Sequence, residues 1–197
     1  MSTLKVDTIL KRTGTGTITV GQSGDTITIP SGATLNSAGT NTLSGISNTP
    51  AFFVTLTANQ TVSDNVKTKV TWTNEVYDTN SAFASDKFTV PSGQAGKYNF
   101  YLSITCGTSG SWGVINARAY IYKNGTSIYY FQGVKNEQGN DAFAVTGTLS
   151  LDLAVGDYIE VYGRNDNDAG TPYFLGKSGD SPNEERTWFG GYKVIGA

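Results

Sequence analysis

Residues 66–105 read VKTKVTWTNEVYDTNSAFASDKFTVPSGQAGKYNFYLSIT, and apolar and polar residues alternate along much of this stretch. The clearest alternation is at its end, where Tyr98, Phe100, Leu102 and Ile104 fall on one face of an extended chain. Successive side chains of a strand point to opposite faces, so this pattern predicts a half-buried antiparallel strand. The sequence PSG at 91–93 predicts the turn that comes before it.

The same alternation recurs from Pro50 to Ala197. Turn sequences, Asn124-Gly125 and Gly156-Asp157 among them, separate the alternating segments. About eight strands with no helical crossover predict an all-β sandwich or jelly roll with almost no helix. The positions expected in the core are Phe52, Val54 and Leu56; Val70, Trp72 and Val76; Ala117, Ala119 and Ile121; Val145, Leu149, Leu151 and Leu153; Ile159 and Val161; and Trp188, Tyr192 and Val194.

Length and charge set outer limits on function. A chain of 197 residues with 38% hydrophobic content can bury one core, so we expect one domain plus an appendage. The net charge of -2, with 15% charged residues, gives no basic stripe, so we expect no nucleic-acid partner. No apolar run approaches the roughly 20 residues that cross a bilayer, and the start lacks signal-peptide features, so we expect neither membrane insertion nor secretion. The single cysteine, Cys106, is expected to be a buried thiol.

The chain divides into three predicted parts: residues 1–13, 14–49 and 50–197. The first has apolar residues at Leu4, Val6, Ile9 and Leu10 and is too short to fold alone. We expect it to be a segment that anchors the chain to another surface.

Residues 14–49 form a Gly/Thr-rich stretch with a repeat of eight or nine residues. TITV at 17–20 returns as TITI at 26–29, and the apolar anchors are Ile18, Ile27, Leu35 and Leu43. Each unit has too few apolar side chains to offset the entropy of ordering its backbone, about 1–2 kcal/mol per residue. Three copies wrapped about one axis would bring equivalent anchors together, which predicts a trimeric β stem. The alternative is a flexible Gly/Ser/Thr linker.

Several motifs of the C-terminal part resemble the C1q/TNF-like jelly-roll family, in the family's order. They are DKFTVP at 86–91, AGKYNF at 95–100, AYIYKNG at 119–125, LSLDL at 149–153, GDYIEV at 156–161 and WFGGY at 188–192. One departure is Asp86, which stands where the family usually has glycine. The resemblance implies a ten-stranded, homotrimeric jelly roll whose apical loops bind receptors or ligands.

The start STLKVDTI and the later GDTITIPSGATL also resemble bacteriophage fibre proteins. This resemblance implies an anchor, a trimeric stem and a distal head. It predicts a virion protein made in the host cytoplasm, with other virion proteins as partners of residues 1–13.

Catalytic and metal chemistry are weakly represented. The chain has no histidine, which excludes Ser-His-Asp and Cys-His catalysis. Carboxylates among Glu137, Asp141, Asp166 and Asp168 could in principle cleave a glycan, but acidic loop residues are usually solvated, so we expect no enzyme activity. Asp166 and Asp168 are also weak candidates for Ca²⁺, against an ordinary Asn/Asp turn, and no other cofactor is expected.

Aromatic residues are the better candidates for recognition. Rings can stack on sugar faces, and the candidates for receptor or glycan contact are Trp112, Tyr129, Tyr130, Tyr173 and Phe174. The alternative is that these rings lie in the core or at a trimer axis. We therefore expect a homotrimeric virion fibre or spike that binds a host-surface receptor or glycan through its head. The alternatives are a fibre or decoration protein on capsid or tail without a receptor role, and a secreted C1q-like ligand.

Overall fold

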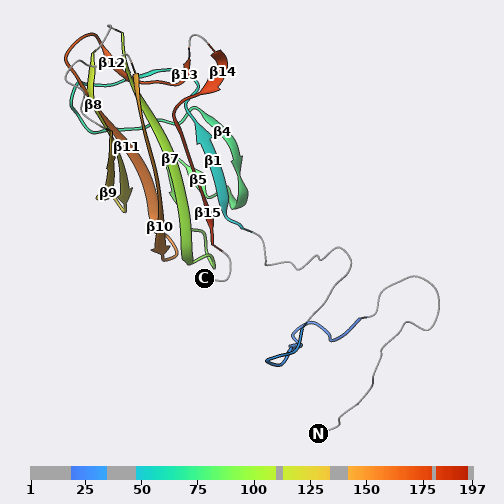
Figure 1. Ribbon diagram of the computed structural model, residues 1–197. Helices are drawn as coiled ribbons and strands as arrows, with labels where there is room; N and C mark the ends of the chain where they lie inside the picture. The colour runs from blue at the N-terminus through green and yellow to red at the C-terminus, as the bar shows by residue number, and fades with distance from the viewer. Residues whose placement is uncertain (1–18, 35–47, 110–112, 134–141, 179–180, 195–197) are drawn as a thin grey trace, which may run out of the picture. The chain divides into compact units, whose positions relative to one another are not determined.

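The structure, a computed structural model, describes residues 19–34, 48–109, 113–133, 142–178 and 181–194. The chain divides into two units, Met1–Leu43 and Ser44–Ala197. Ser44–Ala197 is an all-β sandwich (Figure 1), and the one helix among the described residues is the short η1, Thr79–Ser81. No helix in the described part of the chain is long and apolar enough to span a membrane.

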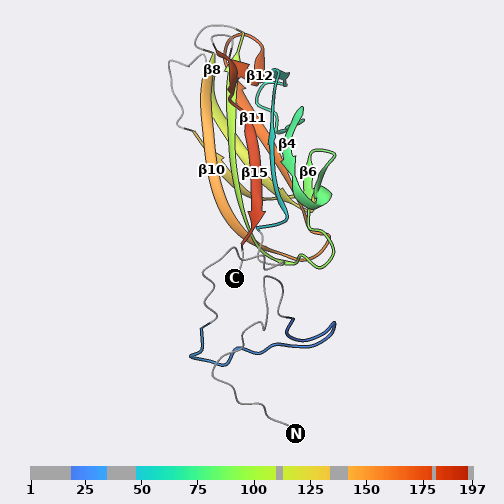
Figure 2. The same ribbon diagram turned by 90° about the vertical axis from the view of Figure 1, so that its right-hand side faces the viewer.

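The first sheet is formed by β4 (Asn74–Asp78), β1 (Ala51–Thr55), β15 (Trp188–Lys193), β7 (Gly96–Thr108) and β10 (Ala142–Leu153), in that order. Short β12 (Pro172–Phe174) and β2 (Gln60–Thr61) continue it beside the end of β7. Its strand pairs are antiparallel. In Figure 2, the strands β10, β15 and β4 of this sheet lie in that order from left to right.

The second sheet is formed by β5 (Phe83–Ala84), β6 (Lys87–Thr89), β11 (Tyr158–Asn167), β8 (Val114–Lys123) and β9 (Thr126–Gln132). The short β3 (Thr68–Lys69) pairs with β11. A separate hairpin joins β13 (Lys177–Ser178) to β14 (Ser181–Glu185). Connections that cross from sheet to sheet, such as β7 to β8 and β10 to β11, make the sandwich a jelly roll.

The core between the sheets is built on phenylalanines. The ring of Phe52 lies 5.0 Å from each of the rings of Phe83, Phe88 and Phe189, measured between centroids. The predicted inward residues of β7, Tyr98, Phe100, Leu102 and Ile104, are completely buried, which confirms the alternation that indicated this strand. Burial of a large aromatic side chain is worth several kcal/mol, so this cluster is the main source of stability.

One carboxylate links two distant turns. Asp157 accepts hydrogen bonds from Asn124 Nδ2 at 2.7 Å and from the Ala154 N–H at 2.9 Å, and pairs with Lys123 Nζ at 2.7 Å. Asn124 Oδ1 in turn accepts from the N–H of Tyr158. The motifs KNG and GDY are therefore two halves of one contact, which fixes the β8–β9 hairpin beside the start of β11.

Asp86, which stands where the resembled family usually has glycine, lies in a left-handed turn. Ser85 and Asp86 have φ angles of 52° and 58°, in the left-handed region that glycine adopts without strain. Asp86 is tolerated because its Oδ1 accepts a hydrogen bond of 2.8 Å from the Trp72 N–H.

Two predictions about the core are wrong. Val76 is 52% exposed, because the register of β4 against β1 shifts by one residue between Phe53 and Val54. In β15 the inward residue is Phe189, which is fully buried, whereas Trp188 and Tyr192 lie on the outer surface of the first sheet.

Residues 19–34 of the first unit contain two turns, with the N–H of Asp25 donating to Gln22 O and that of Ala33 to Pro30 O. No strand occurs within residues 19–34, although the repeat predicted one per unit. The stem anchor Ile27 is 60% exposed. Ile18, Leu35 and Leu43, and the predicted anchor residues Leu4, Val6, Ile9 and Leu10, lie outside the described residues.

Candidate functional site: an aromatic face on the first sheet

The outer surface of the first sheet carries five aromatic side chains from four adjacent strands. They are Tyr77 of β4, Phe53 of β1, Trp188 and Tyr192 of β15, and Tyr101 of β7. We call this set the aromatic face. Tyr77 is 45% exposed and the other four are half-buried. These strands put one ring cluster on the core side and a second on the solvent side of the same sheet.

The rings of the aromatic face contact one another. The Phe53 ring lies 6.2 Å from each of the rings of Tyr77, Tyr101 and Trp188, and the Tyr101 and Trp188 rings are 6.0 Å apart. The hydroxyls of Tyr77 and Tyr101 are 3.3 Å apart and share a hydrogen bond. These separations lie in the range of favourable aromatic pairs, so the face is ordered before anything binds it.

Gly190 makes this arrangement possible. It lies opposite Phe53 on one side of β15 and opposite Tyr101 on the other. A methyl group at this position would lie 2.6 Å from the Tyr101 ring, closer than van der Waals contact allows. The missing side chain leaves room for the neighbouring rings to lie over the strand.

A hollow adjoins the aromatic face on the β10 side. Its volume is about 560 Å³, and its lining includes Tyr101, Trp188, Thr146, Thr148 and Gly147. The outward residues of β10 in the lining are Thr146 and Thr148, and none of the lining residues is charged. An uncharged, aromatic and concave surface is suited to the side chains of another protein surface.

The Tyr101 hydroxyl of the aromatic face is already partly shielded from water in the single chain. Burial, followed by the hydrogen bond with Tyr77, raises the pKa of the Tyr101 hydroxyl well above its ordinary value. The phenol therefore stays neutral at every physiological pH, and no charge opposes covering the face.

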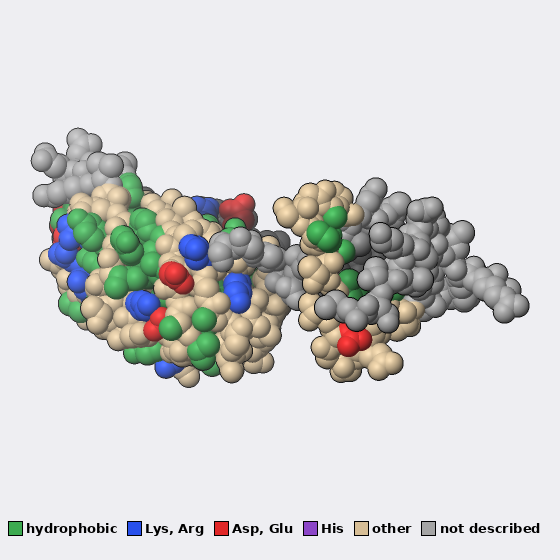
Figure 3. Space-filling model, turned by 90° about the horizontal axis from the view of Figure 1, so that it is seen from below, with side chains coloured by type: hydrophobic (Ala, Val, Ile, Leu, Met, Phe, Trp, Pro, Cys, Tyr) green, Lys and Arg blue, Asp and Glu red, His purple; other side chains and the backbone are tan. Residues whose placement is uncertain are grey.

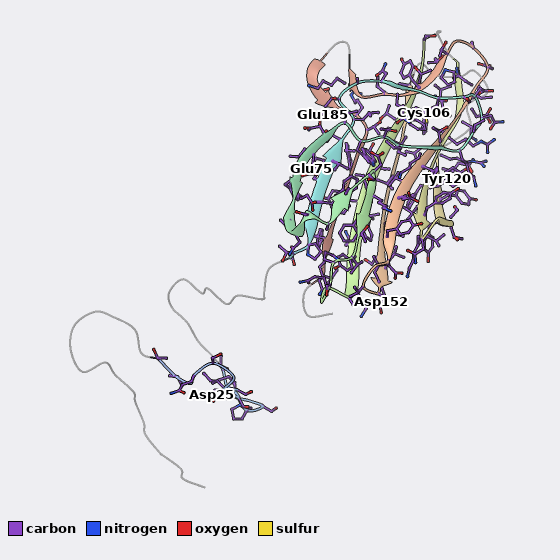
Figure 4. The ribbon with its side chains drawn as sticks, turned by 180° about the vertical axis from the view of Figure 1, so that it is seen from behind. Asp25, Glu75, Cys106, Tyr120, Asp152 and Glu185 are labelled. Atoms are coloured by element: carbon purple, nitrogen blue, oxygen red, sulfur yellow. The ribbon has the colours of Figure 1, made fainter. Side chains whose placement is uncertain are left out.

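The outer surface of the second sheet is different. Tyr120, Tyr122, Tyr130 and Tyr162 lie on it, and we call this set the tyrosine face (Tyr120 is labelled in Figure 4). The ammonium of Lys67 lies 4.5 Å from the Tyr120 ring centroid, and the guanidinium of Arg118 lies 5.9 Å from that of Tyr130. Tyr120 is buried and Tyr130 is 61% exposed, and each ring has a cation beside it. Figure 3 likewise shows Lys and Arg side chains standing among hydrophobic ones on the lower side of the head.

The structure separates the aromatic residues predicted for receptor contact. Tyr129 and Tyr130 are 55% and 61% exposed, so they are available for contact. Tyr173 is half-buried, and its hydroxyl donates to the carbonyl of Thr108. Phe174 is fully buried, with its ring 2.4 Å from where a methyl group at Gly163 would lie, so it is a core residue and not a contact residue. Trp112 lies outside the described residues.

The weak calcium candidates do not gather further ligands. Among the described residues, no three Asp, Glu, Cys or His side chains lie close enough together to hold a metal ion. The carboxylate of Asp166 lies 3.9 Å from the Arg164 guanidinium, and Asp168 is exposed. Glu137 and Asp141, considered as partners in a carboxylate pair, lie outside the described residues.

Cys106 is a buried thiol, as predicted. Its Sγ donates to the carbonyl of Arg164 at 3.7 Å, and burial raises the pKa of the thiol to about 12. Such a group is unreactive, because the thiolate is the nucleophilic form.

Sequence analysis missed the aromatic face. Phe53 and Tyr101 were not among the predicted core or contact residues, and Trp188 and Tyr192 were predicted in the core. One signal could have indicated it: the paired glycines of WFGGY, since two adjacent small residues on a strand flanked by rings leave space on both faces.

Comparison with known proteins identifies the fold. No protein-family model and no curated protein sequence matches the chain. The crystal structure of murine APRIL at pH 5.0 matches with a TM-score of 0.50 and 14% identity, covering 73% of this chain and 98% of that one. The globular domain of zebrafish complement 1qA protein matches with a TM-score of 0.48 and 19% identity, covering 74% and 98%. Together with the strand order, the APRIL match confirms the predicted C1q/TNF-like jelly roll.

Proposed function

We propose that the chain is a homotrimeric, non-enzymatic virion fibre or spike protein whose C-terminal head attaches to a host surface. The observation that carries the proposal is the aromatic face with its adjoining hollow. Exposed apolar surface of this kind costs free energy in water, about 25 cal/mol per Å², and a second copy of the chain is the partner available to every molecule. The resemblance of the head to C1q/TNF-like jelly rolls implies three copies.

A ring of three requires two different complementary surfaces on each copy. The aromatic face supplies one. The other candidate is the opposite side of the sandwich, where β9 and β10 are the last strands of their sheets. Tyr129 is 55% exposed there, and the edges of both strands lack a neighbouring strand among the described residues. An unpaired edge carrying apolar side chains favours association.

The stem supports the same number of copies. Ile27 is 60% exposed in the single chain, and so is Val20. A repeat that exposes its apolar anchors gains stability only when equivalent anchors meet, as in a three-chain stem. The order of anchor, stem and head, with its resemblance to phage fibre proteins, supports the virion setting and other virion proteins as partners of residues 1–13.

The oligomer is tested by sedimentation equilibrium of the full chain at micromolar concentration. The 20.9 kDa chain should sediment as a species of about 63 kDa, three times that mass. Trp188→Ser removes a ring that contacts both Phe53 and Tyr101 and should shift the protein towards monomer. Tyr122→Ser removes a ring of β8 that stacks on Tyr162, away from both proposed trimer surfaces, and should leave the trimer intact. A monomeric wild-type protein would refute the proposal.

Attachment is tested separately, with fluorescently labelled full-length protein on a panel of bacterial strains. Saturable binding to some strains, competed by unlabelled protein, is the expected result. A trimer that binds none of them while the virus infects one would favour the second candidate, a structural fibre or decoration protein. That candidate is favoured by the same aromatic face, which needs no receptor.

A further inference from the structure

A second cavity lies where the edge strands of the two sheets approach each other. β4 is the last strand of the first sheet, and β5 is the last strand of the second. The cavity has a volume of about 310 Å³, and we call it the Trp72 cavity. None of the five residues of the aromatic face lines it, so trimer formation through that face does not use it. Its principal lining residues are Val54, Trp72, Asn74, Glu75, Phe83 and Asp86.

The aromatic wall of the cavity is held in place. The Trp72 ring stacks on the buried ring of Phe189, with centroids 5.9 Å apart and planes 27° from parallel. Its backbone N–H donates to Asp86 Oδ1, and the strained left-handed turn at Ser85 and Asp86 fixes that carboxylate. Backbone strain of this kind persists where the surroundings over-determine the conformation, and it is frequent at binding sites.

The indole N–H of Trp72 is an unsatisfied donor. Its nitrogen is buried and has no hydrogen-bond partner in the described part of the chain. A buried donor without a partner destabilises the protein, and most native structures avoid it. This nitrogen has almost no surface accessible to water, so it lies behind the wall of the cavity and does not itself contact a ligand.

Glu75 provides the complementary group. Its side chain is exposed, and none of the described residues makes a hydrogen bond or ion pair with it. Figure 4 shows it at the β4 edge of the head, far from the tyrosine face, which is marked by Tyr120. The cavity thus offers one free carboxylate acceptor and an aromatic wall.

These groups select a class of ligand. A pyranose ring has an apolar face that can lie against an aromatic ring, and hydroxyls that both donate and accept. The lining includes the carboxylates of Glu75 and Asp86 and no lysine or arginine, so an anionic sugar is disfavoured by charge. The volume is at the small end of ligand sites, which suits one sugar ring and not an extended chain.

We propose that the Trp72 cavity binds one neutral pyranose residue, the terminal sugar of a host-surface glycan. The proposal rests on the proposed attachment function and names its ligand class and its site. The site differs from the exposed tyrosines of β9, whose neighbouring cations suit a different ligand.

The test is isothermal titration calorimetry of the full-length protein with D-glucose, D-galactose, D-mannose and N-acetylglucosamine, each up to about 50 mM, because single sugars bind weakly. Binding of at least one of these sugars, and at least tenfold weaker binding of D-glucuronic or D-galacturonic acid, is expected. Trp72→Phe keeps a ring against Phe189 but makes the aromatic wall smaller, and should weaken binding several-fold. Glu75→Gln should weaken neutral-sugar binding and reduce the discrimination against the uronic acids.

Tyr130→Phe is the matched control, because it changes an exposed ring on the other sheet and should leave the sugar affinity unchanged. Absence of binding by all four neutral sugars overturns the proposal, and so does binding that Trp72→Phe and Glu75→Gln both leave intact. Sedimentation of the same samples keeps the two proposals apart: a trimer that binds bacterial cells but no neutral sugar retains the proposed function and loses only the Trp72 cavity.

Discussion

Two adjacent glycines of β15 give the sharpest test of how the first sheet is used. Gly190 faces the aromatic face and Gly191 faces the core, so the same change to alanine probes opposite sides of one strand. A methyl group at Gly190 would lie 2.6 Å from the far end of the Tyr101 side chain, which is half-buried and can rotate. A methyl group at Gly191 would lie 2.6 Å from the Phe100 ring and 3.1 Å from the Asn99 carbonyl oxygen.

The expected magnitudes differ accordingly. Overpacking a core costs about 1–3 kcal/mol, and replacing glycine by alanine at an ordinary φ returns about 0.5 kcal/mol through the unfolded chain. Phe100 is fully buried among the rings of Phe88, Tyr98 and Phe189 and cannot move away, so Gly191→Ala should destabilise the fold by about 0.5–2.5 kcal/mol. Gly190→Ala should change the stability of the folded chain by less than about 1 kcal/mol, because the Tyr101 ring can turn aside.

Assembly should respond in the reverse order. Displacing Tyr101 breaks its contacts with Phe53 and Trp188, so Gly190→Ala should weaken the trimer. Urea unfolding at one protein concentration measures stability, and sedimentation equilibrium measures association, with concentration matched because oligomer stability depends on it. The reasoning would be refuted by a Gly190→Ala protein that trimerises like the wild type, or by a Gly191→Ala protein that is as stable as the wild type.

Two further predictions concern groups whose titration is shifted. Hydrogen bonds from Lys123, Asn124 and Ala154 lower the pKa of Asp157 to about 2 from 3.8. Because the folded protein disfavours protonation of Asp157, this stabilisation is complete above about pH 4 and is lost as the pH falls towards 2. Asp157→Asn should remove that pH dependence in urea titrations. It should also lower the stability at pH 7 by about 1 kcal/mol, a value reduced for solvent screening. Burial raises the pKa of Cys106 to about 12, so the native thiol should resist a thiol reagent at pH 8 and react fully in urea.

Each of these predictions has its own contrary result. If the stability of the Asp157→Asn protein falls between pH 4 and pH 2 as steeply as that of the wild type, other carboxylates carry the acid sensitivity. Rapid labelling of Cys106 in the folded protein would show that the end of β7 opens, contrary to its complete burial.

The sequence contained enough information for the jelly roll but not for its outward surfaces. The alternation of β7 and the coupled turn residues Asn124 and Asp157 reflect the backbone geometry directly, because each depends on neighbours along the chain or on one paired turn. In β15, by contrast, WFGGY has aromatic residues at both odd and even positions, so the alternation alone cannot tell which of them faces the core. Pairing with β7 places Phe189 opposite the inward Leu102, and this sets which residues of β15 face the core.

The same limit applies to the candidate sites. The aromatic face and the Trp72 cavity each assemble residues from three or more separate segments, and no motif in the sequence joins them. Phe174 was expected at a binding loop because its surroundings in sequence are rich in glycine and polar residues. It is buried because Gly163 of β11 leaves the space that its ring fills.

The two outer surfaces of the sandwich differ in charge, and this difference orients the proposed trimer. The tyrosine face has cations at its rings, Lys67 over Tyr120 and Arg118 near Tyr130, so covering it with another copy of the chain would bury charge. The aromatic face is lined by rings, threonines and a hollow, and the shifted pKa of Tyr101 reflects partial desolvation already. Burying charges costs more than burying neutral rings, so the aromatic face should turn towards the threefold axis. The tyrosine face, on the opposite side of the sandwich, then points outwards.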